Sequence, residues 1–205
     1  MNAVADDILP TALRNEPLSR HTSWRVGGPA DLFFEPTSVE DLQRVLADLP
    51  VEMPVHWVGL GSNLLVRDGG VRGTVVFTHG ALSSIECSDE AVYAEAGVPS
   101  PKLARTASKH DLTGAEFMAG IPGTIGGAVR GNAGAFGTEI KDVATRVRAI
   151  DSETGETRVF ENDVCDFSYR HSFFKDHPEW IITSVRIRLV PGEPEDIKKS
   201  IEETI

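Results

Sequence analysis

The spacing of apolar positions predicts a first module in which one helix lies among three strands. Ser38 is a typical helix N-cap, and Asp41 follows three residues later as in a capping box. The helix would carry one apolar stripe, formed by Leu42, Val45, Leu46 and Leu49. Short apolar runs predict strands at 31–35, 55–60 and 73–78, and a glycine loop directly follows the second of them.

A second module follows and contains a predicted helix and a predicted hairpin. Ser100 and Pro101 suit the first turn of a helix that runs to about residue 110. The predicted strands of this module are 91–96, 143–151, 157–160 and 180–190, and the second and third of them form the hairpin.

The last segment begins where Pro-Gly-Glu-Pro at 191–194 breaks the final strand. After it, Ile197, Ile201 and Ile205 lie four residues apart, on one face of a helix. Such a helix either begins a further domain or docks back on the body of the protein, and the pattern leaves both open. The predicted division is a leader at 1–20, two subdomains at 21–90 and 91–192, and the start of a missing domain at 193–205.

Composition narrows the classes of function. The 205 residues have a formal net charge of -11, which argues against binding nucleic acid or an anionic membrane. It leaves phosphate ligands possible, because backbone N–H groups can bind them locally. The two cysteines, Cys87 and Cys165, lack metal-site spacing, and we expect no metal. Without a signal peptide or a long apolar run, the sequence predicts a cytoplasmic protein.

A first glycine loop spans residues 59–64 at the end of a predicted strand. Gly59 and Gly61 would let the backbone approach a ligand, and Ser62 and Asn63 add side-chain donors. Leu64 stands where the dinucleotide fingerprint has its third glycine, and no Gly-Lys-Ser/Thr follows for a P-loop. Taken alone, the loop is more typical of an ordinary turn.

The second glycine segment is denser, with seven glycines among the eighteen residues from 120 to 137. A flexible linker is one interpretation, but a solvated linker would not carry interleaved apolar residues: Ile121, Ile125, Val129 and Phe136. The segment is better interpreted as a surface that closes over a flat ligand with phosphates. One ligand spanning both loops is then expected, and a dinucleotide such as FAD has a suitable length and charge.

Residues 167–175 place aromatic side chains around Arg170 and Lys175. Arginine suits a carboxylate or a developing enolate, because its planar fork stays charged and binds bidentately. A surface arginine stacked on its aromatic neighbours explains the pattern equally well, and both interpretations stay open. The sequence supports neither a nucleophilic triad nor a glycosidase-type pair of carboxylates.

Several segments resemble, in order, the motifs of one family, the MurB reductases (UDP-N-acetylenolpyruvoylglucosamine reductases). The matching segments are 21–31 (HTSWRVGGPAD), 59–65 (GLGSNLL), 114–128 (GAEFMAGIPGTIGGA), 132–137 (NAGAFG) and 167–172 (FSYRHS). They cover nearly all of the chain from residue 20, and together they are specific although each is short. Leu60 is a departure, because the family often has a third glycine there.

The resemblance implies an α+β fold of the PCMH (vanillyl-alcohol-oxidase-like) type, with FAD bound tightly but non-covalently between two α+β subdomains. It also implies that NADPH reduces the flavin, which then reduces UDP-N-acetylglucosamine enolpyruvate to UDP-N-acetylmuramate, a peptidoglycan precursor. By the same resemblance Arg170 is catalytic and Tyr169 contacts the substrate. The implied cofactor-binding residues are Gly59, Gly61, Ser62, Asn63, Leu64, Ile121, Pro122, Gly123, Gly126, Gly127, Asn132 and Gly134.

The family also uses a proton-donor serine and a glutamate from a third domain, and neither is assigned here. We therefore expect this chain alone to turn over poorly or not at all, and we expect a monomer. No tyrosine loop follows Val190, which resembles the type II members. Two rival hypotheses remain: an oxidase of the same fold with flavin attached through a histidine, and a flavin-binding module without catalysis.

Overall fold

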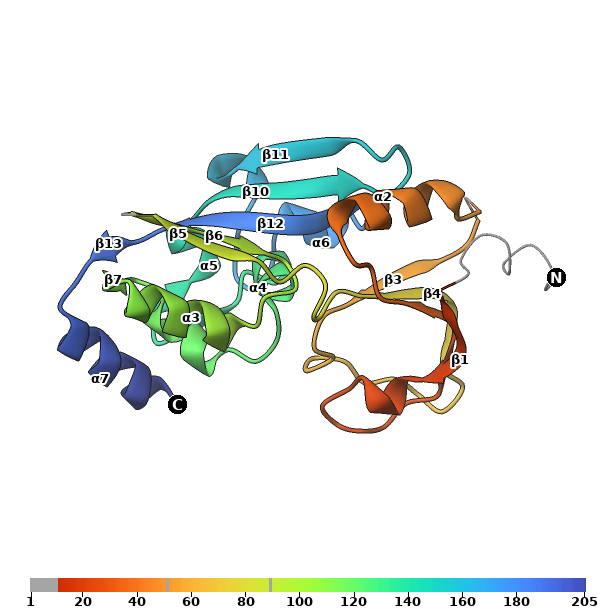
Figure 1. The fold of residues 1–205 in the computed structure, drawn as a ribbon, viewed down its shortest axis with the longest axis horizontal. Coiled ribbons are helices and arrows are strands. Elements are labelled where there is room, and N and C mark those ends of the chain that lie inside the picture. The colour runs from red at the N-terminus through yellow and green to blue at the C-terminus, as the bar shows by residue number, and fades with distance from the viewer. Residues whose placement is uncertain (1–10, 51, 89) are drawn as a thin grey trace.

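The computed structural model describes residues 11–50, 52–88 and 90–205, and these form two lobes with a sheet each (Figure 1). The four-stranded sheet of the first lobe has the order β1-β2-β4-β3. β4 is parallel to both β2 and β3, whereas β1 pairs antiparallel with β2. The elements are β1 (Leu13–Pro17), the 3-10 helix η1 (Leu18–Arg20), β2 (Pro29–Phe34), α2 (Val39–Asp48), β3 (Val55–Val58) and β4 (Val71–Phe77).

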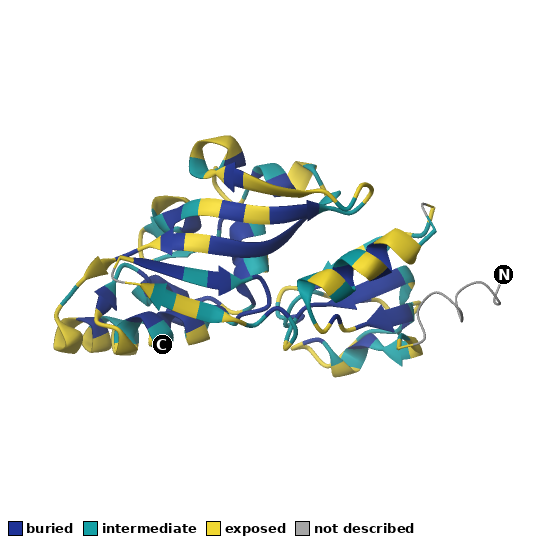
Figure 2. Cartoon of the chain, turned by 45° about the horizontal axis from the view of Figure 1, so that its top comes forward, coloured by how far each residue is buried: buried dark blue, intermediate teal, exposed yellow. Residues whose placement is uncertain are grey.

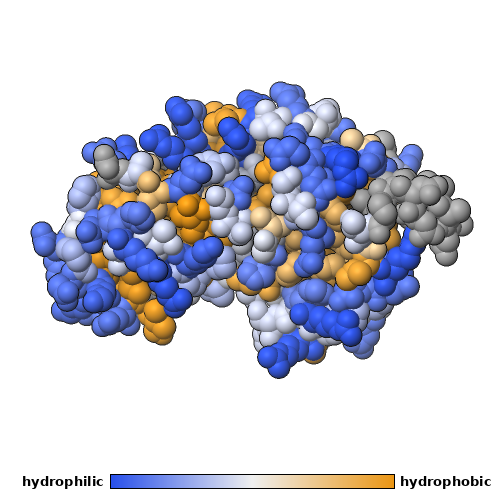
Figure 3. Space-filling view, in the orientation of Figure 1, coloured by the Kyte–Doolittle hydropathy of each residue, from blue (hydrophilic) through white to orange (hydrophobic). Residues whose placement is uncertain are grey.

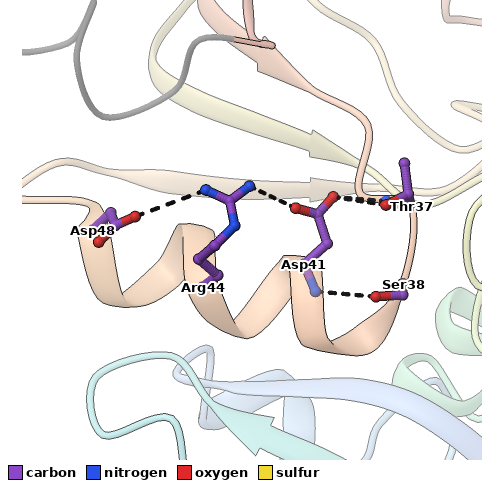
Figure 4. Close-up of polar contacts among 5 residues, drawn as sticks. All are labelled: Thr37, Ser38, Asp41, Arg44 and Asp48. Atoms are coloured by element: carbon purple, nitrogen blue, oxygen red, sulfur yellow. Dashed lines mark hydrogen bonds and ion pairs between the residues drawn. The ribbon is translucent and has the colours of Figure 1, made fainter.

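Helix α2 begins as the sequence predicts. The Asp41 backbone N–H donates to the Ser38 hydroxyl over 3.1 Å, and the Asp41 carboxylate accepts from the Thr37 backbone N–H over 2.9 Å (Figure 4). Arg44 then links Asp41 to Asp48 along the exposed face (Figure 4). The opposite face of the helix is apolar and buried against the sheet (Figure 2): it carries Leu42, Val45 and Leu46.

The predicted leader over 1–20 is partly structured. Residues 1–10 lie outside the described part of the chain, but β1 extends the first sheet at its edge. Leu13 faces Phe33 of β2, and Pro17 faces Pro29. Most side chains of β1 are exposed, and its sequence has no apolar alternation from which a strand could be predicted. The strand is defined by its backbone pairing with β2.

The second lobe contains a five-stranded antiparallel sheet in the order β11-β10-β12-β6-β5. On β10, buried Val147 and Ala149 alternate with exposed Arg146 and Arg148, whereas β12 is buried throughout 181–185. Its strands are β5 (Ile85–Ser88), β6 (Ala91–Glu95), β10 (Ala144–Asp151), β11 (Thr157–Glu161) and β12 (Trp180–Arg188). Two small pairs join β7 (Leu112–Thr113) to β13 (Val190–Pro191) and β8 (Gly134–Ala135) to β9 (Thr138–Glu139).

Short helices cover this second sheet and hold most of the glycine-rich segment. They are α3 (Ser100–Lys109), η2 (Glu116–Gly120), α4 (Ile125–Arg130), α5 (Ile140–Val143), η3 (Asn162–Cys165), α6 (Phe173–Asp176) and α7 (Pro194–Thr204). β5 pairs with β6, so the sheet of the second lobe starts at Ile85, before the boundary predicted at residue 90.

The two lobes share part of their cores. Ile150 of β10 and Ile181 of β12 pack in one buried cluster with the apolar face of α2. The amide of Gln43 on α2 also donates over 3.4 Å to the carbonyl oxygen of Gly155, in the predicted hairpin turn. This contact region fixes the ends of β10 and β12 against the first lobe.

Helix α7 lies against α3 and η2 of the second lobe. Ile197 is buried and Ile201 is half-buried against the main core, whereas Ile205 is 77% exposed. The helix therefore docks on the body through two of its three predicted positions. Within the described residues, no helix combines the length and apolar character needed to cross a membrane.

Candidate functional site

The first glycine loop follows β3 and is held by the segment 21–31. Gly61 has a φ of +62°, and an added Cβ would lie 2.0 Å from the carbonyl oxygen of His21. The Ser23 N–H donates to the Gly61 carbonyl over 3.2 Å. Only glycine satisfies both the conformation and the close approach at this position. The opening motif of the sequence therefore fixes the shape of the loop.

The same segment makes a second close contact with the chain beyond the loop. A Cβ at Gly28 would lie 2.0 Å from the carbonyl oxygen of Asp68, and the Gly28 N–H donates to the backbone carbonyl of Arg67 over 3.0 Å. The Thr22 hydroxyl closes the turn by donating to the Val26 carbonyl over 2.9 Å. Glycine in this motif thus serves backbone packing between 21–28 and 67–70.

The second glycine segment runs from η2 into α4 and contacts the end of β6. The Gly126 N–H donates to the Ala96 carbonyl over 2.9 Å, and a Cβ at Gly126 would lie 2.9 Å from the Ala96 Cβ. Ile121, Ile125 and Val129 are buried, which excludes the flexible-linker interpretation. Phe136, the fourth interleaved apolar residue, is 74% exposed.

The two glycine loops, one from each lobe, meet. A Cβ at Gly59 would lie 2.4 Å from the Thr124 hydroxyl oxygen, and a Cβ at Gly123 would lie 3.0 Å from the Ser62 hydroxyl oxygen. Beside this junction lies a cavity of about 130 Å³, and Gly59, Gly126 and Gly127 are among the residues that line it. Figure 3 shows one face of the molecule, hollowed between the lobes.

The cavity wall combines apolar side chains with glycine backbone. Trp57, Ile181 and Ile182 supply apolar surface, while a Cβ at Gly127 would have nothing within 4 Å. Nearby, the Ser100 N–H donates to the Gly123 carbonyl, and the fully buried Ser100 hydroxyl has no hydrogen-bond partner within the described residues. Glycine at the cavity wall lets a phosphate approach the backbone N–H groups.

A second cavity, of about 400 Å³, contains the predicted catalytic arginine. Gly134, Glu139, Lys141, Tyr169 and Arg170 are among the residues that line it. Arg170 has a φ of 55°, and its guanidinium carbon lies 5.9 Å from the centre of the Tyr169 ring, which is 82% exposed. The arginine therefore lies over an aromatic ring and also lines a concave surface, and both interpretations of the motif stay open.

Arg130 was not predicted from the sequence, and it joins α4 to the segment that directly follows the arginine motif. It lies on the wall of the smaller cavity, at the end of α4, and its guanidinium donates to the carbonyl oxygens of Phe174 and Lys175. In return, the Ser172 hydroxyl donates to the Arg130 carbonyl over 2.7 Å. Burial lowers the pKa of the Arg130 guanidinium. Sequence gave no signal for this contact, because the partners lie more than forty residues apart.

The predicted cofactor residues fall into different places. Gly59, Gly126 and Gly127 line the smaller cavity, and Ser62 meets Gly123 at its edge. Gly134 lines the larger cavity instead. The remaining positions line neither cavity: Gly61 supports the loop from behind, Asn63 and Pro122 are exposed, Ile121 and Asn132 are buried, and Leu64 packs on the core of the first lobe.

Among residues 11–50, 52–88 and 90–205, no group of three or more His, Cys, Asp or Glu side chains is arranged to hold a metal ion. Burial raises the pKa of the Cys165 thiol to about 12 and also raises that of Cys87. Neither cysteine is therefore a thiolate at neutral pH.

Comparison with known proteins agrees with the geometry. The family model described as "FAD binding domain" matches residues 30–161. A UDP-N-acetylenolpyruvoylglucosamine reductase from Methylococcus capsulatus is 47% identical over 89% of this chain and 60% of its own length. The reductase of the same name from Alkalilimnicola ehrlichii is 43% identical over 98% of this chain and 67% of its own length. The chain thus spans about 60% of the length of such relatives.

Solved structures agree as well. The crystal structure of the MurB reductase from Thermus caldophilus covers 92% of this chain at 32% identity, with a TM-score of 0.79 and 66% of its own length matched. A cholesterol oxidase from Brevibacterium sterolicum, at 17% identity and a TM-score of 0.60, shares the fold alone. The predicted α+β, PCMH-type fold class is confirmed. The chain belongs to the FAD binding domain family and, within it, to the UDP-N-acetylenolpyruvoylglucosamine reductases.

Proposed function

We propose that this chain binds FAD non-covalently between its lobes and forms the flavin-binding part of a reductase. The reductase converts UDP-N-acetylglucosamine enolpyruvate to UDP-N-acetylmuramate with NADPH, in cytoplasmic peptidoglycan precursor synthesis. The observation that carries the proposal is the meeting of two glycine loops, from separate lobes, beside one cavity. Arg130, on the wall of that cavity, is also hydrogen-bonded to the segment that directly follows Arg170.

The residues of the chain have distinct tasks in this proposal. The backbone N–H groups of the glycine loops bind the pyrophosphate, because glycine lets a phosphate approach the main chain. Bound FAD supplies the hydride chemistry. Arg170 binds the substrate carboxylate and stabilises the negative charge that develops next to it, since a guanidinium stays charged and donates in pairs. Tyr169 forms the neighbouring wall of the substrate pocket.

The chain alone is expected to turn over poorly. The resemblance assigns the proton-donor serine and a glutamate to a part of the family that these residues do not match, and proton transfer is a large share of the catalysis. We also propose that the protein is a monomer that binds neither nucleic acid nor membrane, in agreement with its net charge of -11.

The test is the visible absorbance of the purified chain after incubation with excess FAD and gel filtration. We expect flavin bands that co-migrate with the protein and are released by acid precipitation. Gly127→Leu should abolish them, because a side chain there extends into open space on the cavity wall. Gly131→Leu is the matched control, because Gly131 lies at the far end of α4 and outside the cavity.

Each outcome is informative. Absence of flavin after incubation would overturn the proposal for this chain. Colour that stays with the acid-denatured protein would favour the covalent oxidase hypothesis. Flavin binding without NADPH oxidation, after fusion to the C-terminal third of the Alkalilimnicola ehrlichii reductase, would favour the non-catalytic module.

A further inference from the structure

Asn132 lies just after α4 with a φ of 41° and is 1% exposed. Its amide nitrogen donates to the Ser168 carbonyl over 2.9 Å and to the Glu139 carboxylate over 3.1 Å. Its amide oxygen accepts from the Lys141 N–H over 3.0 Å. Because an amide carries only two N–H donors, both are satisfied inside the protein and neither is left for a cofactor.

Glu139 is the second member of this cluster. Its carboxylate accepts from Asn132, pairs with the Lys141 ammonium at 2.5 Å, and caps α5 through the Asp142 N–H. The Lys141 ammonium first, then Asn132 and the positive charge of Arg170, lower the pKa of the Glu139 carboxyl group. Glu139 is thus a negative charge with a fixed position on the wall that Arg170 shares.

Arg170 needs such support from its surroundings. It lies in a tight turn in which Ser168 and His171 exchange two backbone hydrogen bonds of 3.1 Å, with a left-handed backbone that L-residues adopt only at a cost. The Asn132 amide is bonded to the Ser168 carbonyl, at the start of that turn. Asn132 therefore ties the turn to the C-terminal end of α4.

We propose that Asn132 and Glu139 are positioning residues for Arg170: Asn132 anchors its turn, and Glu139 provides the counter-charge that holds the guanidinium in the pocket. In this proposal Asn132 acts on the arginine turn and not as a cofactor ligand, which departs from the role that the family resemblance suggested for it. The inference rests on the proposed role of Arg170 as the catalytic arginine. A guanidinium that is already ordered loses less entropy when it binds a carboxylate.

The test uses the 205-residue chain, with and without FAD. Asn132→Asp keeps the shape of the side chain but replaces both donors with a carboxylate next to Glu139. Glu139→Gln removes the charge and leaves an acceptor for Asn132. Asn162→Asp is the matched control, because the Asn162 amide nitrogen also has two acceptors, the backbone carbonyls of Lys141 and Ala144, but no hydrogen bond to the arginine turn is found for it within the described residues.

Two quantities are measured in each variant. The first is the FAD dissociation constant, from quenching of flavin fluorescence. The second is the guanidinium Nε–H signal of Arg170 in a nitrogen-15 NMR spectrum, assigned by its loss in Arg170→Lys. We expect FAD affinity to change by less than about threefold in all variants. The Arg170 signal should move towards that of a freely rotating arginine in Asn132→Asp and Glu139→Gln, and should stay in place in Asn162→Asp.

The proposal is overturned if Asn132→Asp weakens FAD binding by about tenfold or more while the Arg170 signal stays in place, since Asn132 would then be a cofactor ligand. It is also overturned if the Arg170 signal is unchanged in both variants. If Asn132→Asp does not fold, Glu139→Gln carries the test. If the wild-type chain binds no FAD, the proposed function fails separately, because the Arg170 signal is measured without flavin as well.

Discussion

Gly59→Ala should separate the two glycine loops. The new methyl carbon would lie 2.4 Å from the hydroxyl oxygen of Thr124 and 3.0 Å from its methyl carbon. Gly59 does not have a left-handed backbone, so alanine meets no conformational obstacle and the effect is one of space alone. Thr124 is buried, so its side chain cannot rotate freely into solvent. One loop must then retreat by about 1 Å to restore ordinary contact.

The size of the effect follows from overpacking. Forcing a methyl group into a closely packed contact costs about 1–3 kcal/mol. If the loops open to relieve the contact, this cost appears in the affinity for FAD, where about 1.4 kcal/mol corresponds to a factor of ten. We therefore expect the FAD dissociation constant to rise by about tenfold or more, measured by fluorescence titration, with thermal melting recorded to confirm folding.

Two controls make this reasoning refutable. Gly69→Ala lies in the same lobe, where an added Cβ meets nothing within 4 Å, and should leave FAD binding unchanged. Thr124→Ala removes both atoms that the new methyl would contact most closely, so the double variant should regain most of the affinity. If Gly59→Ala binds FAD as tightly as Gly69→Ala, or if Thr124→Ala gives no rescue, contact between the loops does not govern the site.

Three further predictions concern single side chains. Arg170→Lys should leave FAD affinity unchanged but lower enolpyruvyl reduction by about 10²–10³, followed as NADPH oxidation in the fusion with a relative's C-terminal third, because an ammonium cannot donate bidentately. The Thr37 backbone N–H mainly lowers the pKa of the Asp41 carboxyl from 3.8. The ionised Asp41 carboxylate therefore stabilises the fold fully above pH 3.8, and this stabilisation is lost as the pH falls through the lower pKa of the folded state. The difference in melting temperature between wild type and Asp41→Asn should accordingly shrink in acid. Because burial raises the pKa of Cys165 to about 12, peptide mass spectrometry should find Cys165 unalkylated by iodoacetamide in the folded chain and alkylated after unfolding.

The sequence predicts best where local chemistry determines the structure. Helix α2 begins at the N-cap Ser38 and buries the predicted apolar stripe, because capping and a helical period act within a few residues. The strands of the first module lie within two residues of their predicted ends, because the short apolar runs that predict them are also a local signal. β1 was not predicted, because its residues LRNEP show no apolar alternation and the strand is defined only by pairing with β2.

The candidate site divides in the same way. Glycine is conspicuous in a sequence, so both loops could be found, and family resemblance supplied Arg170. Asn132 and Glu139 have ordinary side chains, and the bond from Asn132 to Ser168 spans 36 positions, which no local pattern encodes. Phe136, counted among the apolar residues of the loop, is 74% exposed, because β8 and β9 turn it outwards beside the larger cavity.

Arg130 ties the end of α4 to the segment that follows the arginine motif. Its side chain leaves the wall of the smaller cavity and ends on the backbone of α6, directly after the arginine motif. The Ser172 hydroxyl bonds back to the Arg130 carbonyl, so the two contacts form a closed bracket between α4 and α6. Asn132, two residues further on, adds a third tie to the same motif. Because α4 also carries Gly126 and Gly127, the helix that borders the proposed flavin cavity is hydrogen-bonded, directly or through Asn132, to the chain on both sides of Arg170. If the proposed roles hold, this one short helix sets the distance between the cofactor and the arginine.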